Sequence, residues 1–196
     1  ELAMDFGSNI TAGDNWNPPN LETLNDSTIL NDHIKLTNCT TLTTLNNVNI
    51  SGGDLSDLFN GCTNLATINN CTFNATTSLV RAFKGCSKLT VNPITTIPDT
   101  VTDISEMYSG CTGITNISGM TFGSGITSST DFIKDVPLVH ADDITIKSFI
   151  SRLPVIIFEN MSNLISVKNL RLVKPSNEPF VNLNNMFSGC VNLEDV

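Results

Sequence analysis

Cysteine and histidine are the residues of this chain with the widest chemistry, since they can bind metals, form disulfides or act as nucleophile and base. The chain has 196 residues, with six cysteines and two histidines. No two cysteines stand in a C-x-x-C or similar spacing, which disfavours a zinc site. Five of them recur at one position of a repeated phrase: Cys39, Cys62, Cys86, Cys111 and Cys190. Asp135 and Met161 fill this position elsewhere, so we predict buried free thiols without obligatory disulfides.

The histidines and aspartates show no active-site pattern. His33 and His140 lie near no serine or cysteine nucleophile in the sequence, and neither G-x-S-x-G nor H-E-x-x-H occurs. A group of aspartates lacks the ligand spacing of a calcium loop: Asp131, Asp135, Asp142 and Asp143. We therefore predict a protein without catalytic activity, cofactor or metal.

Polar residues at matching positions of the repeats offer hydrogen bonding to a ligand. They form three predicted columns. The first contains Thr44, Thr67, Asn116 and Ser166; the second contains Asn46, Asn69, Ser118 and Lys168; the third contains Asn49, Thr72, Thr121 and Arg171. Columns of mostly neutral donors and acceptors suit a protein or glycan ligand on an extended repeat surface. The alternative interpretation is that these residues are only the solvated face of a sheet.

A short phrase, repeated along the chain, must position these columns. It reads LFNGCTNL at 58–65, AFKGCSKL at 82–89, MYSGCTGI at 107–114 and MFSGCVNL at 186–193. Looser copies place Cys39, Asp135 and Met161 at the cysteine position, with Phe132 and Phe158 at the aromatic position. The steps between copies range from 23 to 29 residues, as in leucine-rich repeats.

Each repeat is predicted to contain one short helix and one short strand. Leu55, Leu58 and Phe59 have the i, i+3, i+4 spacing of a helix face, and Gly61 stands where a helix needs a left-handed C-terminal residue. After the cysteine, apolar residues alternate with Thr, Asn and Ser as in a strand and turn. We predict an α/β leucine-rich-repeat solenoid of about 25 residues per repeat with one parallel sheet. One buried aromatic ladder is expected: Phe59, Phe83, Tyr108, Phe132, Phe158 and Phe187.

The repeated phrase resembles the BspA-type leucine-rich repeat family of bacterial surface proteins. The shared pattern is an aromatic residue, then a small residue, Gly and Cys, with Leu three residues later, ahead of a short strand. It covers most of the chain, from about residue 30 to residue 196. The resemblance implies an extracellular or surface-exposed binding module, often an adhesin, with no catalytic residues. Related repeats also occur in receptor-binding proteins of phage tails.

The net charge and the extent of the repeat pattern indicate which partners are disfavoured and where the domains begin and end. The net charge of −9 disfavours nucleic acid or an anionic membrane as partner. The apolar stretch 153–158 is too short for membrane insertion and contains Pro154. We expect residues 1–28 to form an N-terminal cap or linker and residues 29–196 to form a solenoid of about seven repeats. The pattern stops within a repeat at Val196, so we expect further repeats or another chain to cover the C-terminal edge.

The sequence thus favours a non-enzymatic extracellular or cell-surface module that binds or adheres to a protein or glycan through its repeat surface. Two alternatives stay open. One is a structural virion component, such as a phage tail fibre or receptor-binding arm. The other is an accessory domain of a larger enzyme. The low-charge, Asn- and Thr-rich surface fits the adhesin and the virion component equally, and flanking sequence would discriminate among the three.

Overall fold

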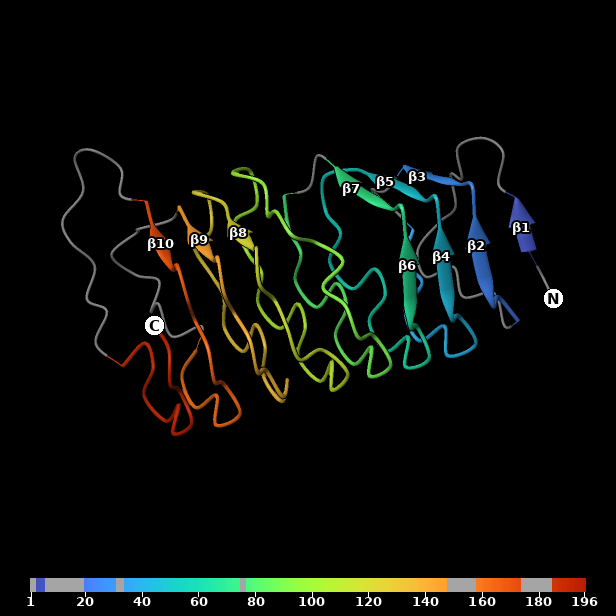
Figure 1. The fold of residues 1–196 in the computed structure, drawn as a ribbon. Coiled ribbons are helices and arrows are strands. Elements are labelled where there is room, and N and C mark those ends of the chain that lie inside the picture. The colour runs from blue at the N-terminus through green and yellow to red at the C-terminus, as the bar shows by residue number, and fades with distance from the viewer. Residues whose placement is uncertain (1–2, 6–19, 31–33, 75–76, 148–157, 174–184) are drawn as a thin grey trace.

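The repeats stack into a parallel β-solenoid, in which each repeat forms one rung and successive rungs lie side by side along one axis (Figure 1). The computed structural model describes residues 3–5, 20–30, 34–74, 77–147, 158–173 and 185–196. Strand β1 lies at one end of the axis and the C-terminal rung at the other. Among the described residues, no helix has the length and apolar character that crossing a membrane requires.

The strands form three sheets, and every strand pair in them is parallel and in register. The first two sheets run side by side through the same rungs, and the third lies in the C-terminal rungs. The first has the order β1-β2-β4-β6, the second β3-β5-β7 and the third β10-β9-β8. The first contains β1 (Ala3–Asp5), β2 (Thr23–Asn25), β4 (Thr44–Asn46) and β6 (Thr67–Asn69). The second contains β3 (Thr28–Leu30), β5 (Asn49–Ser51) and β7 (Thr72–Asn74). The third contains β8 (Thr121–Phe122), β9 (Thr145–Ile146) and β10 (Arg171–Leu172).

The corner between the first two sheets follows directly from the sequence. The triplets Thr-Leu-Asn and Thr-Ile-Asn form β2, β4 and β6, with the central apolar residue facing the core. The next residue, Asp26, Asn47 or Asn70, has a φ of 46°, 54° or 51°. Asn and Asp tolerate this left-handed conformation better than other residues with a Cβ. The chain therefore turns at this position and begins β3, β5 or β7 two residues later.

The predicted helix in each repeat is wrong, because the described residues contain no helix. In its place the segment before the cysteine is a series of three-residue turns. Within one rung, Leu58 N donates to Leu55 O (3.3 Å) and Cys62 N donates to Phe59 O (3.1 Å). These are i to i−3 bonds, whereas an α-helix needs i to i−4 bonds.

Every second N–H of this segment donates to the next rung instead. Asp57 N bonds Val80 O at 2.9 Å, Phe59 N bonds Ala82 O at 2.8 Å, and Gly61 N bonds Lys84 O at 2.8 Å. Asp57 has a φ of 61°, which a right-handed helix cannot include. The i, i+3, i+4 apolar spacing therefore comes from consecutive turns that are hydrogen-bonded to the neighbouring rung. We call this side of the solenoid the turn face.

An aromatic ladder fills the core beneath the turn face. Phe59 and Phe83 stack with ring centroids 5.5 Å apart, and Phe83 and Tyr108 stack at 5.6 Å. Tyr108 meets Phe132 edge-on at 5.6 Å, and Phe158 stacks on Phe187 at 5.6 Å. These contacts confirm the predicted ladder from Phe59 to Phe132 and between Phe158 and Phe187. The prediction of one continuous ladder is wrong at one junction, because no ring contact joins Phe132 to Phe158 among the described residues. All the rings are buried except that of Phe187, which is half-buried.

The predicted register of the rung around Asp135 is wrong by one residue. Asp135 is exposed and has a φ of 61°, so it occupies the position of Gly110, and Gly110 N donates to Lys134 O. The buried Val136 is therefore the residue at the cysteine position. Phe132 correspondingly stands at the position of Met107, since Tyr108 N donates to Phe132 O as Phe83 N donates to Met107 O. This shift explains why its ring meets Tyr108 at 64° and does not stack.

The cysteine column lies in the core and binds the preceding rung. All six cysteines are in the thiol form, and Cys39, Cys62, Cys86 and Cys111 are buried. The Cys86 thiol donates to Phe59 O at 3.2 Å, and the Cys111 thiol donates to Phe83 O at 3.0 Å. The column thus gives weak inter-rung hydrogen bonds to the carbonyls of the ladder residues.

One rung interrupts the stacked strands. Residues 89–94 form no strand between β6 and the segment around Asn116, and pairing resumes only at the bridge between Thr96 and Thr121. Pro93 lies in this stretch and has no N–H for a ladder bond. Ile94 is buried there, whereas Val91 is half-exposed. The third sheet, which continues the column of Asn49 and Thr72, is therefore separate from the second sheet.

The repeat pattern extends into the segment before residue 29. Leu21 and Leu24 are fully buried, and Thr23 pairs with Thr44 in register. Ala3 in turn pairs with Thr23. The rest of the predicted N-terminal cap, residues 1–2 and 6–19, lies outside the described residues, as does His33.

Candidate binding surface

The structure brings the predicted columns together as rung-to-rung neighbours. Thr44 pairs with Thr67, Asn46 with Asn69 and Asn49 with Thr72. Each pair belongs to adjacent parallel strands, so the side chains project from the same side of the sheet. We call the surface formed by these columns the strand face. Its column positions in β2 to β7 are all threonine or asparagine.

The first column continues beyond the interrupted rung through a residue that the sequence reasoning missed. His140 forms bridges with both Asn116 and Ser166, and Ser166 forms one with Asp195. His140 is exposed, whereas Ser166 is only 4% exposed. The sequence does contain a clue to His140. It lies two residues after Leu138, just as Thr67 of the first column lies two residues after Leu65.

In the second column the side chains bind one another across the rungs. Asn46 Nδ2 donates to Asn25 Oδ1 at 2.8 Å, and Asn69 Nδ2 donates to Asn46 Oδ1 at 2.9 Å. A parallel row lies beside it, where Asn47 Nδ2 donates to Asp26 Oδ1 at 2.8 Å and Asn70 Nδ2 to Asn47 Oδ1 at 3.2 Å. This amide ladder satisfies part of the polar surface internally, so it orders the face and reduces what is left for a ligand.

The second column changes chemistry in the C-terminal half. Asp142 Oδ1 accepts from the Ser166 hydroxyl and from Lys168 N (2.8 Å). These two bonds, with the Ser166 bond dominant, hold the pKa of Asp142 below its ordinary value. Ser118 Oγ in turn accepts from Asp142 N at 2.9 Å. Asp142 is therefore a structural link between three rungs, and Ser166 is internal to it.

The third column remains open to solvent at most of its members. Thr72 is exposed and donates to Asn49 Oδ1 at 2.7 Å. Thr121 and Arg171 both pair with Thr145, a column member that sequence reasoning missed. Its signal was the match of residues 142–145 to residues 46–49. The strand face is thus neutral in β2 to β7 and includes charged members in the C-terminal rungs.

The turn face differs because its polar residues are charged and paired. Arg81 binds both carboxylate oxygens of Asp57, with Nε to Oδ1 at 2.7 Å and a second bond of 2.8 Å. Lys84 pairs with Glu106, which also lies 4.0 Å from Arg81. The hydrogen bond from Arg81 holds the pKa of Asp57 below its ordinary value. These pairs link adjacent rungs and occupy the charges that an ionic partner would use.

Nucleophilic chemistry is disfavoured at Cys62, Cys86 and Cys111, whose pKa values are raised, whereas the hydrogen bond with Cys62 lowers the pKa of Cys39. Burial raises the pKa of the Cys111 thiol from 9.0 to about 12. Burial also raises the pKa of Cys86, and for Cys62 the hydrogen bond with Cys39 acts in the same direction together with burial. The thiolate is the reactive form, so these thiols are inert at neutral pH. Among the described residues, no group of three or more His, Cys, Asp or Glu side chains is placed to hold a metal ion.

Comparison with known proteins gives one structural neighbour. No family model matches the chain, and no curated protein matches it. The chain is similar to a solved structure. It is the crystal structure of the T. pallidum leucine-rich repeat protein TpLRR, at 17% identity, a TM-score of 0.48, and with 89% of this chain and 79% of that chain covered.

Proposed function

We propose that this chain is a non-enzymatic binding module that recognises a protein or glycan through the strand face. The observation that supports it is the in-register array of neutral hydroxyl and amide groups over β2 to β7. Several rungs present the same groups at the spacing of parallel strands, about 4.8 Å. A partner with its own repeating or extended shape can therefore engage many rungs at once.

The two faces differ in what they offer a partner. On the turn face, the charged residues are already paired across rungs. On the strand face, Thr67 and Asn69 are exposed, and the amide row ends at Asn69, whose Oδ1 has no following asparagine. Neutral, directional hydrogen-bonding groups favour specific recognition over general ionic attraction.

The proposal also covers the family to which the chain belongs and where the protein acts. We propose a BspA-type leucine-rich repeat that works outside the cell or at its surface as an adhesin. The supporting observation is the Gly-Cys phrase, whose glycines Gly61, Gly85, Gly110 and Gly189 all have positive φ. The proposal that the chain is not an enzyme is supported by the buried thiols of raised pKa.

The test uses arrays of purified extracellular proteins and of polysaccharides, probed with the wild-type chain and two lysine variants. Thr44→Lys with Thr67→Lys places charge on the strand face. Thr40→Lys with Thr63→Lys is the matched control, because both residues are exposed threonines of the same two rungs, in the turn after the cysteine and outside the polar columns. We expect saturable binding to an array member that the strand-face variant loses and the control retains. Equal loss in both variants, or no saturable binding on either array, contradicts the proposal.

A further inference from the structure

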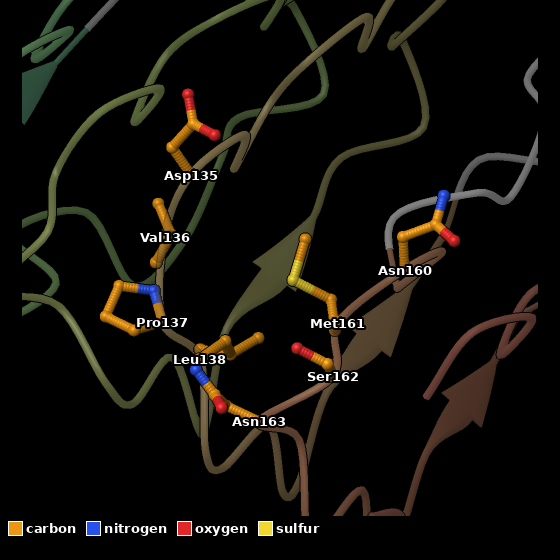
Figure 2. A pocket seen from close by; sticks show the side chains of 8 residues that line it. All are labelled: Asp135, Val136, Pro137, Leu138, Asn160, Met161, Ser162 and Asn163. Atoms are coloured by element: carbon orange, nitrogen blue, oxygen red, sulfur yellow. The ribbon is translucent and has the colours of Figure 1, made fainter. Parts of the chain in front are cut away.

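A cavity of about 290 Å³ lies between two neighbouring rungs, where residues 135–138 form one wall and residues 160–163 form the other. Figure 2 shows the Met161 side chain reaching into the space between these walls, with Val136 and Leu138 on the facing side. The Asp135 carboxylate lies at one end and the Asn163 carboxamide at the other. The cavity is separate from the polar columns of the strand face.

The cavity exists because one turn is a residue shorter than its neighbours. In the rung of Cys62 the next buried leucine comes three residues after the cysteine, and Leu65 N donates to Cys62 O. Here Leu138 comes only two residues after Val136, and Leu138 N donates to Val136 O. Pro137 fills the position where Thr63 N donates to Gly61 O, and proline has no N–H. The shortened turn leaves the neighbouring rung without a full surface to pack on.

Two hydrogen bonds that join turns elsewhere in the solenoid are absent between the described residues 135–138 and 159–163. Asn64 Nδ2 donates to Thr40 O at 2.8 Å, and Asn192 Nδ2 donates to Ser162 O at 2.7 Å. Asn163 occupies the same repeat position, but its carboxamide has no such bond. Likewise Gly110 N donates to Lys134 O, whereas Asp135 N makes no bond to Glu159 O.

The free groups and the walls select the kind of ligand. Asp135 offers acceptors only, the Asn163 carboxamide offers both donors and acceptors, and the Ser162 hydroxyl offers both. No Lys or Arg lines the cavity, which disfavours an anion. One carboxylate is too few for a divalent cation that prefers six or more oxygen ligands. Pro137, Leu138 and Met161 add apolar surface beside the polar groups.

We propose that this cavity binds a single pyranose ring, with its hydroxyl groups on Asp135, Ser162 and Asn163 and its C–H face against Pro137 and Met161. The volume is at the lower limit of small-molecule pockets, about 300 Å³, and so suits one ring but not a longer chain. Such a ligand has both donor and acceptor hydroxyls and no net charge, which matches the free groups. The proposal stands on this geometry and is independent of the strand-face function.

The experiment is NMR titration of the ¹⁵N-labelled chain with the methyl glycosides of glucose, galactose, mannose and N-acetylglucosamine. We expect saturable shifts of residues 135–138 and 160–163 with one of them, at an affinity on the order of 1 mM. A trisaccharide that ends in the same ring tests whether the natural ligand is the end of a glycan or a free sugar. Equal or tighter binding assigns the site to a glycan end, and weaker binding assigns it to the free sugar. Both outcomes support the proposal.

Two variants remove the polar groups without disturbing the rung. Asp135→Gly suits the φ of 61°, and Asn163→Ala removes an amide with no internal partner among the described residues. Each should weaken binding at least about tenfold. Asn64→Ala is the control at the equivalent position of a regular rung and should leave the affinity unchanged. No shifts at these residues with any glycoside, shifts with calcium chloride alone, or equal losses in Asn64→Ala would overturn the proposal.

Discussion

The Tyr108 hydroxyl donates a 2.6 Å hydrogen bond to Oδ1 of Asn92. This bond joins the aromatic ladder to the one rung in which the strand face is interrupted. Tyr108 is fully buried, and burial raises its pKa well above the ordinary value. Asn92 Oδ1 also accepts from Ile94 N at 3.2 Å, whereas its Nδ2 is buried with no partner in the described structure. A tyrosine in a column of phenylalanines is therefore matched to an irregular strand that supplies its acceptor.

We predict that Asn92→Ala destabilises the chain more than Tyr108→Phe. Tyr108→Phe removes one hydrogen bond, at a cost of about 1 kcal/mol, and Phe83 shows that a phenylalanine fits the column. Asn92→Ala leaves a buried hydroxyl without its acceptor, at a cost of about 1–3 kcal/mol. Urea unfolding of both variants and of the double variant measures the difference. A coupling energy near zero in this cycle would show that the bond does not contribute to stability.

The corrected register makes a prediction at two adjacent residues. Asp135→Gly should leave stability within about 1 kcal/mol of wild type, since glycine relieves the left-handed strain and costs some chain entropy. Val136→Ala should cost about 2 kcal/mol, since Val136 occupies the buried cysteine position. Thermal melting of both variants decides the matter. A larger loss from Asp135→Gly than from Val136→Ala would restore the register expected from the sequence.

Alanine substitutions at Gly119 and Gly125 should destabilise the chain for two different reasons, backbone strain at Gly119 and a steric clash at Gly125. Gly119 has a φ of 77° and open space where a Cβ would stand, so Gly119→Ala should cost about 1 kcal/mol from conformation alone. A Cβ at Gly125 would lie 2.1 Å from Asp99 O, a backbone atom of the preceding rung. Gly125→Ala should therefore cost more, about 3 kcal/mol, because the rungs must separate. Equal unfolding free energies for the two variants in urea would count against the close stacking of these rungs.

The buried thiols predict a loss of stability at alkaline pH. The pKa of Cys111 is raised in the folded chain, so its contribution is fully present below 9.0, where the thiol is neutral in both states. As pH rises from 9.0 to about 12, only the unfolded state ionises, and stability falls. Each such thiol removes up to about 1.4 kcal/mol per pH unit.

Urea unfolding of wild type and Cys111→Ala at pH 8 and pH 10 measures this effect. The variant should be less stable at pH 8, because it loses a core side chain and a hydrogen bond, but its stability should fall less between the two pH values. Identical pH dependence in both chains would mean that the thiol is ionised or exposed in the folded state.

The strand half of each repeat could be predicted because its signal is local. Leu45 between Thr44 and Asn46 fixes which side chains face the core, and the repeated spacing fixes their partners in the next rung. The turn half could not be assigned, because Leu55, Leu58 and Phe59 have the same spacing in a helix and in successive three-residue turns. The difference lies in whether the N–H of Asp57 bonds within its own rung or to Val80 of the next.

The register around Asp135 misled for a related reason. Phe132 and Leu138 match the spacing of Phe59 and Leu65, yet the rung is shortened after Val136 and its aromatic residue stands one position early. The early aromatic residue and the shortened turn cancel each other, so Phe132 and Leu138 keep the spacing of a regular repeat. The amide ladder of Asn25, Asn46 and Asn69 was likewise visible only as a polar column, since sequence does not show that the side chains bind one another.

The binding function of the strand face is tested most directly by one ratio of dissociation constants. Thr67 and Thr63 are exposed threonines of one rung: Thr67 belongs to the strand face, and Thr63 lies in the turn after Cys62, outside the polar columns. With the partner identified on the arrays, interferometry gives Kd for Thr67→Lys and for Thr63→Lys. The account predicts that Thr67→Lys weakens binding at least about tenfold, whereas Thr63→Lys stays close to wild type. A ratio near one, or a greater loss from Thr63→Lys, would contradict it.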